Sequence, residues 1–242
     1  MKLDDLIGKI TCADCLDILK QLPDESIDLV CTDCPYHLAY NGAGGRCAKK
    51  WKTAGQLKNY ENVKAGKMFA NNDIEFEDWL PEMYRVLKDN THCYIMINGR
   101  NIAELQKQAE KVGFKFQNLL VWKKNTATPN KFYMQCCEFI LMLRKGNERW
   151  INNMGQKNLL EMVNITGNKP HPTAKPVELM EILIANSTNE NDIVLEPFAG
   201  GGSTCIAAKN LNRRFIGIEL DEEYAKVAQE RLEQSQRQQT LF

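Results

Sequence analysis

An acidic residue, a proline and an aromatic residue follow a short apolar run, in the order Asp33-Cys34-Pro35-Tyr36. The run begins at Ile27 and has the length of a buried strand, which Pro35 cannot continue. Asp33 and Tyr36 are therefore predicted at the carboxyl end of a strand, where open α/β sheets bind their ligands. A carboxylate beside a rigid turn and an aromatic face can hold a flat, amino-bearing molecule such as a nucleobase. The alternative is a strand that simply ends in a turn.

Three consecutive glycines stand between a predicted strand and a predicted helix, in the segment Glu196-Pro197-Phe198-Ala199-Gly200-Gly201-Gly202-Ser203-Thr204. Such a turn lets a ligand approach the backbone closely. It is not a P-loop, and it is not the GxGxxG of dinucleotide binding, because Cys205 stands at the third glycine position. The next predicted strand ends in Glu219, in the position of an acid that binds ribose. We expect a ligand with a ribose; the alternative is a tight turn followed by an ordinary surface acid.

Two CxxC pairs, Cys12/Cys15 and Cys31/Cys34, have a spacing that also occurs in zinc sites. The residues between them, however, read as a helical turn, a break at Pro23 and a buried strand, and the pairs lack the glycines and prolines of metal knuckles. We therefore predict no metal site. The nine cysteines are an odd number, and several lie in apolar strand-like runs, so no disulfide framework is expected either.

Strands and helices alternate along the 242 residues, which predicts one α/β domain with a mainly parallel sheet and helices on both faces. The helix predicted over residues 76–87 starts near Trp79, with Pro81 in its first turn. Residues 123–135 are predicted as a polar loop between paired strands, and residues 147–169 as irregular. The strands are predicted at residues 9–12, 27–33, 93–97, 118–122, 139–143, 193–195 and 215–219, and the remaining helices at 15–19, 100–112, 176–185, 203–211 and 221–234.

The formal net charge is zero, so no global basic field points to nucleic acid. One segment, residues 41–70, is nevertheless strongly basic, with a single acid, Glu61, among its seven cations. It predicts a local phosphate-binding surface, although a solvated loop would have the same composition. No apolar run approaches the ~18 residues of a membrane span, so a soluble, cytoplasmic protein is expected. The cations are Arg46, Lys49, Lys50, Lys52, Lys58, Lys64 and Lys67.

Four segments together resemble the amino-group DNA methyltransferases that use S-adenosylmethionine, in the circularly permuted order called the β group. Residues 196–204 resemble the family's D-P-F-x-G-S-G-T-T cofactor motif, and residues 171–176 are similar to H-P-T-x-K-P. Residues 33–36 look like the catalytic D-P-P-Y, with Cys34 in place of the first proline. Residues 13–28 resemble the lead-in G-D-x-x-x-x-L-x-x-L-P-D-x-S-V-D. The resemblance implies a Rossmann-like methyltransferase fold, with candidate DNA-contacting insertions at residues 37–75 and 123–135.

The resemblance also implies a role for each motif residue. Asp33 and the backbone carbonyl of Cys34 would accept the two N–H groups of an exocyclic amine. Pro35 would keep the turn rigid, and Tyr36 would stack on a base rotated out of the duplex. The implied S-adenosylmethionine site consists of Asp14, Thr173, Lys175, Glu196, Phe198, Gly200, Gly202 and Glu219. The implied DNA contacts are Arg46, Lys49, Lys50, Lys52, Lys123 and Lys124.

The leading function is therefore methylation of the N6 amino group of adenine in double-stranded DNA, because family members specific for cytosine N4 more often carry serine at the position of Asp33. Methylation of cytosine N4, or of an amino group in RNA or protein, stays open. A non-catalytic nucleic-acid-binding protein of the same fold is a further alternative. A second copy of the chain and a cognate restriction enzyme are the other partners considered.

Overall fold

The computed structural model of the chain describes residues 3–35, 74–128, 132–164 and 174–239. The chain divides into two compact units, one of residues 1–34 with 76–242 and one of residues 35–75. Nearly all of the second unit lies outside the described residues, so the description below concerns the first. The predicted single domain with DNA-contacting insertions at residues 37–75 and 123–135 stays a prediction.

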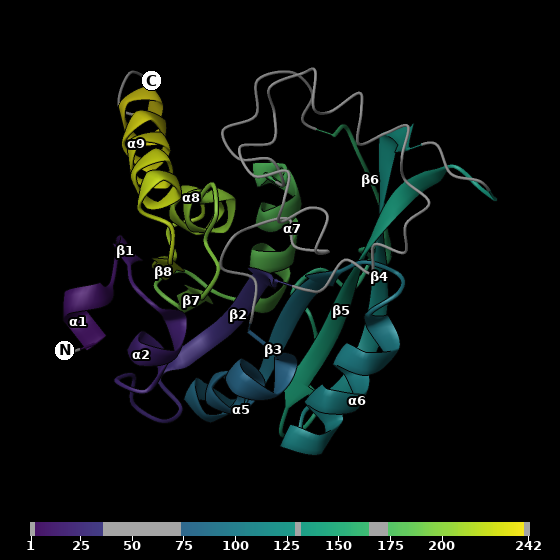
Figure 1. Cartoon of the computed structure of the whole chain (residues 1–242), viewed down its shortest axis with the longest axis horizontal. Coiled ribbons are helices and arrows are strands. Elements are labelled where there is room, and N and C mark those ends of the chain that lie inside the picture. Colours follow the sequence, from purple (N-terminus) through teal and green to yellow (C-terminus); the bar gives the residue numbers. More distant parts are fainter. Residues whose placement is uncertain (1–2, 36–73, 129–131, 165–173, 240–242) are drawn as a thin grey trace. The chain divides into compact units, whose positions relative to one another are not determined.

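The described residues form one sheet of eight strands in the order β1-β8-β7-β2-β3-β5-β4-β6 (Figure 1). Neighbouring strands run parallel from β1 to β3, whereas β5 is antiparallel to both β3 and β4, and β6 is parallel to β4. The predicted α/β class and mainly parallel sheet are confirmed. The strands are β1 (Lys9–Cys12), β2 (Ile27–Asp33), β3 (Leu87–Ile97), β4 (Lys115–Thr128), β5 (Gln135–Lys145), β6 (Leu159–Met162), β7 (Ile193–Glu196) and β8 (Arg214–Glu219).

The parallel strands β7 and β2 are neighbours, but the chain leaves them toward opposite edges of the sheet. From β7 the chain crosses to β8 on one side, whereas from β2 it continues to β3 on the other. Open parallel sheets bind ligands at such a switch point, outside the carboxyl ends of the strands. Asp33 ends β2 and Glu196 ends β7, so both predicted motifs lie at this point.

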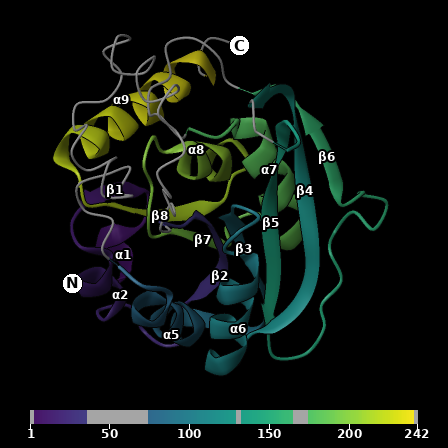
Figure 2. The same cartoon turned by 45° about the vertical axis from the view of Figure 1, so that its right-hand side comes forward.

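Of the described helices, α7, α8 and α9 flank one face of the sheet and α2, α5 and α6 flank the other (Figures 1 and 2). Their burial follows from their sequences: Leu105 and Ala109 of α6, for example, share one apolar face and are fully buried. None of the described helices is long and apolar enough to cross a membrane. The helices are α1 (Leu3–Leu6), α2 (Cys15–Leu19), α5 (Phe76–Val86), α6 (Ile102–Val112), α7 (Val177–Ser187), α8 (Ser203–Asn210) and α9 (Glu222–Gln239).

The predicted starts of one helix and one strand between residues 76 and 97 were wrong. Helix α5 begins at Phe76 rather than near Trp79, so Pro81 lies inside it. Strand β3 begins at Leu87, directly after α5, and not at Cys93. It includes Asn90, whose φ of 60° lies in the left-handed region that strands rarely use. In the sequence, this asparagine reads as the end of an element. Leu87 pairs with Ile27 of β2 and pairing with β5 begins at Thr91, so the polar residues 88–90 lie between two paired segments of the strand.

The predicted loop at residues 123–135 was also wrong in extent. Strand β4 continues to Thr128, which pairs with Gln135 at the start of β5, so the two strands form a long hairpin. Residues 147–169 were expected to be irregular, but residues 159–162 form β6. Both segments are polar, and their strand structure comes from hydrogen-bonding partners that local propensity does not reveal.

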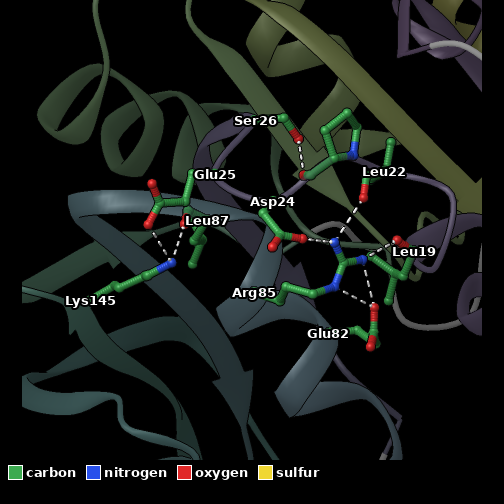
Figure 3. Close-up of polar contacts among 10 residues, drawn as sticks. Leu19, Leu22, Asp24, Glu25, Ser26, Glu82, Arg85, Leu87 and Lys145 are labelled. Atoms are coloured by element: carbon green, nitrogen blue, oxygen red, sulfur yellow. Dashed lines mark hydrogen bonds and ion pairs between the residues drawn. The ribbon is translucent and has the colours of Figure 1, made fainter.

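Arg85 of α5 binds the segment that leads into β2 through hydrogen bonds and an ion pair (Figure 3). Its guanidinium donates to the backbone carbonyls of Leu19 at 2.7 Å and Leu22 at 2.8 Å. It also forms ion pairs with the carboxylates of Asp24 and Glu82, at 2.6 and 2.7 Å. These bonds give the carbonyl of Leu22 a donor and add a second donor to the carbonyl of Leu19 where α2 ends, and so fix the entry to the strand that carries Asp33.

Candidate functional site at the ends of β2 and β7

The carboxylate of Asp33 lies at the carboxyl end of β2, beside Met96 of β3. The next residue, Cys34, turns its thiol inward, where Sγ donates to the backbone carbonyl of Met96 at 3.6 Å. Its side chain is buried, so the backbone of Cys34, and not its thiol, is the group that can meet a substrate. Pro35 is the first residue of the second unit, and Tyr36 lies outside the described residues.

Lys175 reaches Asp33 from the segment before α7. Its ammonium forms an ion pair with Asp33 Oδ2 and lies 3.6 Å from Glu138 Oε2 of β5. Lys124 of β4 pairs with the other oxygen of Glu138. Burial raises the pKa of Asp33 above its usual value, although Lys175 opposes that shift. Burial also acts to raise the pKa of Glu138, but Lys175 and Lys124 together outweigh it and the pKa is lowered.

The glycine turn after β7 is closed by the carboxylate of Glu219. Glu219 Oε2 accepts a hydrogen bond from the backbone N–H of Gly200 at 2.7 Å, and Oε1 accepts one from Asp221 at 2.9 Å. Gly200 and Gly202 have φ values of 50° and 76°, in the left-handed region that favours glycine. Burial raises the pKa of Glu219 above its usual value. Each carboxylate oxygen has a second lone pair, which ribose hydroxyls could use.

Glu196 lies beneath this turn and is almost completely buried. Its carboxyl accepts hydrogen bonds from the hydroxyls of Thr32 and Thr204 and from the backbone N–H of Phe198 at 3.1 Å. Burial raises the pKa of Glu196 to about 8. The hydrogen bond from Thr32 joins β2 to β7. Glu196 therefore links the strand that ends in Asp33 to the strand that leads into the glycine turn.

Asp14 lies next to the same turn because β1 pairs with β8. Cys12 is opposite Glu219, and the backbone N–H of Ala13 donates to the carbonyl of Glu219 at 3.0 Å. Asp14 caps α2 by accepting from the N–H of Leu16 at 2.8 Å. The predicted cofactor residues Asp14 and Glu219 are therefore close in space although they are far apart in the chain.

Two buried donors beside the turn have no partner among the described residues: Ser203 Oγ, at the start of α8, and Trp79 Nε1. The indole of Trp79 packs edge-on against Phe198, with ring centroids 5.5 Å apart. Buried polar groups without partners are rare in folded proteins and often mark a ligand site. Together with Glu219, these donors fit a nucleoside ligand with a polar tail, such as S-adenosylmethionine.

The predicted DNA-contacting lysines of β4 have different surroundings. Lys123 is exposed and pairs with Glu161 of β6, whereas Lys124 points the other way, toward Glu138. At the tip of the same hairpin, Tyr133 and Met134 are 88% and 61% exposed. Thr173 and the predicted DNA contacts Arg46, Lys49, Lys50 and Lys52 lie outside the described residues.

The four cysteines of the CxxC pairs are free thiols with separate surroundings. Cys12 is exposed and Cys15 is buried, while Cys31 contacts the sulfur of Met180 at 3.9 Å. Within the described ranges no group of three or more His, Cys, Asp or Glu side chains could hold a metal ion.

Sequence reasoning missed Glu138, Thr32, Ser203 and Trp79. Ser203 lies inside a recognised motif and Thr32 immediately precedes one, so their positions carried a signal. Glu138 carried no signal in the sequence, because only the structure shows that Lys124 and Lys175 lie beside this glutamate of an apolar strand.

The DNA methylase family, N6_N4_Mtase, matches residues 27–230 of the chain. The type II methyltransferase M.HpaI of Haemophilus parainfluenzae is 32% identical over 93% of this chain and 74% of its own length. M2.DpnII of Streptococcus pneumoniae is 32% identical over 91% of this chain and 88% of its own. The crystal structure of an M1.HpyAVI–SAM complex is 28% identical, with a TM-score of 0.68 over 92% of this chain and 98% of that one.

Proposed function

The chain belongs to the N6/N4 DNA methylase family, and on that premise we propose that it methylates the exocyclic N6 amino group of adenine in DNA, with S-adenosylmethionine as donor. The predicted family, enzyme class and methyltransferase fold are confirmed by this membership and by the solved relatives. The observation that carries the proposal is the position of Asp33 and the glycine turn at the ends of the neighbouring strands β2 and β7.

The donor supplies an electrophilic methyl group on a sulfonium. An exocyclic amine is a poor nucleophile because its lone pair is delocalised into the base. The carboxylate of Asp33 accepts one N–H of that amine and the backbone carbonyl of Cys34 accepts the other, which stabilises the positive charge that develops on nitrogen. Pro35 keeps this turn rigid. Tyr36 stacks on the flipped base, a contact worth ~1–3 kcal/mol against a flipping cost of a few kcal/mol.

On the cofactor side, Glu219 binds the ribose hydroxyls and Asp14 the adenine ring, while Phe198, Gly200 and Gly202 line the site. Thr173 and Lys175 bind the methionine carboxylate through charge-assisted contacts. Glu196 supports the site from beneath, through the hydrogen bonds that it accepts from Thr32, Thr204 and the backbone N–H of Phe198.

DNA is held by the basic residues Arg46, Lys49, Lys50 and Lys52 and by the exposed Lys123 of the hairpin, whereas Lys124, paired with Glu138, is the least suited of the predicted contacts. The exposed side chains of Tyr133 and Met134 support contact at the hairpin tip. We further expect a cytoplasmic location. A homodimer and a cognate restriction enzyme stay predictions, which sedimentation and co-purification would test.

The test is expression in a bacterial host without DNA methylation, followed by mass spectrometry of its nucleosides and single-molecule sequencing. We expect N6-methyladenine in one short sequence context. N4-methylcytosine would establish the cytosine alternative instead, and unmodified DNA from cells with abundant folded protein would contradict DNA methylation.

Two variants separate the two halves of the site. Asp33→Ala should lower kcat by about 10²–10³, the usual loss when one charge-stabilising group is removed, and leave cofactor affinity largely unchanged. Glu219→Gln should mainly weaken cofactor binding, measured by calorimetry with S-adenosylhomocysteine. Loss of cofactor binding in Asp33→Ala would mean that the catalytic role is misassigned.

A further inference from the structure

Arg231 of α9 reaches the glycine turn from outside the motifs recognised in the sequence. Its guanidinium donates a hydrogen bond to the backbone carbonyl of Gly201, 30 positions away. Helix α9 packs against β1 and α8 (Figures 1 and 2). The buried Ala228 of this helix lies so near the turn that a Cβ on Gly202 would be 3.1 Å from its own Cβ. The turn therefore rests against α9, and Arg231 bonds the helix to it.

The guanidinium of Arg231 is half-buried, and burial lowers its pKa below the usual value. Among the residues that the structure describes, its hydrogen-bond acceptor is the carbonyl of Gly201, and no carboxylate pairs with it. Withdrawing a cation from water costs free energy, which this hydrogen bond offsets in part. A hydrogen bond from a charged donor is also stronger than one from a neutral donor, so the carbonyl is held firmly.

Two peptide groups of the turn are bonded within the protein, and they lie on either side of a third. The N–H of Gly200 donates to Glu219 at 2.7 Å, which orients the peptide group before Gly200. The peptide group between Gly201 and Gly202 is bonded at both ends, because its carbonyl accepts from Arg231 and its N–H donates to a backbone carbonyl three residues earlier at 2.7 Å. Within the described part of the chain, the carbonyl of Gly200 and the N–H of Gly201 have no hydrogen-bonding partner. The peptide group that these two form is thus left for a ligand.

We propose that Arg231 is a positioning residue for S-adenosylmethionine: by holding the carbonyl of Gly201, it keeps the peptide group between Gly200 and Gly201 turned toward the cofactor. Glycines have no Cβ, so hydrogen bonds and not side-chain sterics must restrain the torsions on either side of this group. Glu219 restrains one side and Arg231 the other. Without Arg231 the turn has more conformations, and binding must then supply the free energy that orders it. The inference rests on the cofactor part of the proposed function and not on the identity of the methylated base.

The test measures the affinity of the full chain for S-adenosylhomocysteine by calorimetry in Arg231→Met, Arg231→Lys and Lys226→Met. Methionine keeps an unbranched stem but removes the donors, whereas lysine keeps the charge and a donor. Lys226 is the matched control because it is an exposed cation on the same helix. We expect the affinity to fall by about tenfold in Arg231→Met, the factor that corresponds to about 1.4 kcal/mol, and by less in Arg231→Lys. Lys226→Met should bind like the wild type.

Methylation kinetics give a second readout. At saturating cofactor the kcat of Arg231→Met should stay within about twofold of the wild-type value, and the loss should appear in KM for the cofactor. A merely structural role would lower the free energy of unfolding and leave the affinity for S-adenosylhomocysteine unchanged, which would overturn the proposal. An equal loss of affinity in Lys226→Met would overturn it as well.

A wild-type chain that binds no S-adenosylhomocysteine would count against the proposed function instead. Amide hydrogen exchange then still decides, because it needs no ligand. The N–H of Gly202 should exchange about tenfold faster in Arg231→Met, relative to the amides of β8, since its peptide group has lost one of its two bonds. An unchanged ratio would refute the inference.

Discussion

The hydroxyl of Thr32 donates a hydrogen bond to the buried carboxyl of Glu196, across 164 positions of sequence. Thr32 immediately precedes Asp33 on β2, and Glu196 immediately precedes the glycine turn on β7. The candidate catalytic residue and the candidate cofactor turn are thus joined by one bond in the core. Changes to either residue should affect both halves of the site.

The pKa of Glu196, raised to about 8 from 4.5, predicts a pH-dependent stability. Between these values the folded state binds a proton that the unfolded state has lost, so stability falls as pH rises from about 5 to about 8. Glu196→Gln removes this slope. The check is urea unfolding of both proteins at pH 5, 6.5 and 8: the difference in free energy of unfolding should change steadily in favour of the variant as pH rises. A constant difference would contradict the pKa assigned to Glu196.

Lys175→Met should change both the catalytic pH profile and the affinity for the cofactor. Lys175 lowers the pKa of Asp33, so its loss leaves burial and Glu138 to raise that pKa further. The acid limb of kcat should therefore move to higher pH. Cofactor affinity should also weaken, by about 10–100-fold if the methionine carboxylate loses a charged hydrogen bond worth ~1.5–3 kcal/mol. Stopped-time methylation assays across pH and calorimetry would measure the two effects, and unchanged cofactor affinity would show that Lys175 serves Asp33 alone.

Arg85→Ala should destabilise the protein, because it strips hydrogen bonds from the carbonyls of Leu19 and Leu22 as well as two ion pairs. The expected loss is about 1–3 kcal/mol in free energy of unfolding. Lys107→Ala is the matched control on the neighbouring helix α6, since Lys107 is 65% exposed and its ion pair with Glu104 spans 3.9 Å. That change should cost less than about 1 kcal/mol. Equal losses in chemical denaturation would show that the Arg85 network adds nothing.

Gly217→Ala should also destabilise the fold, because a Cβ at this position of β8 would lie 2.7 Å from Sγ of Cys205 and 3.0 Å from Cγ1 of Ile10. Overpacking of this kind costs about 1–3 kcal/mol. In the Cys205→Ala background the cost should shrink, since the nearest atom is gone. A double-mutant cycle measures this coupling. Purely additive effects would mean that the backbone shifts to accommodate the new methyl group.

The family, the alternation of strands and helices, and the place of the main motifs all follow from the amino-acid sequence alone. Asp33 ends a strand and Glu196 begins the glycine turn because short apolar runs, Pro35 and consecutive glycines act locally. Even the closeness of Asp14 to Glu219 was implied by the permuted order and is present in the structure, through the pairing of β1 with β8.

Which charged side chains meet depends on the three-dimensional fold. Lys175 was assigned to a cofactor carboxylate from its motif, yet it pairs with Asp33, 142 positions away, and lies beside Glu138. The strands at residues 123–128 and 159–162 likewise exist because β5 and β4 supply hydrogen-bonding partners. Such contacts depend on distances between segments remote in sequence, for which a local pattern of residue types contains no information.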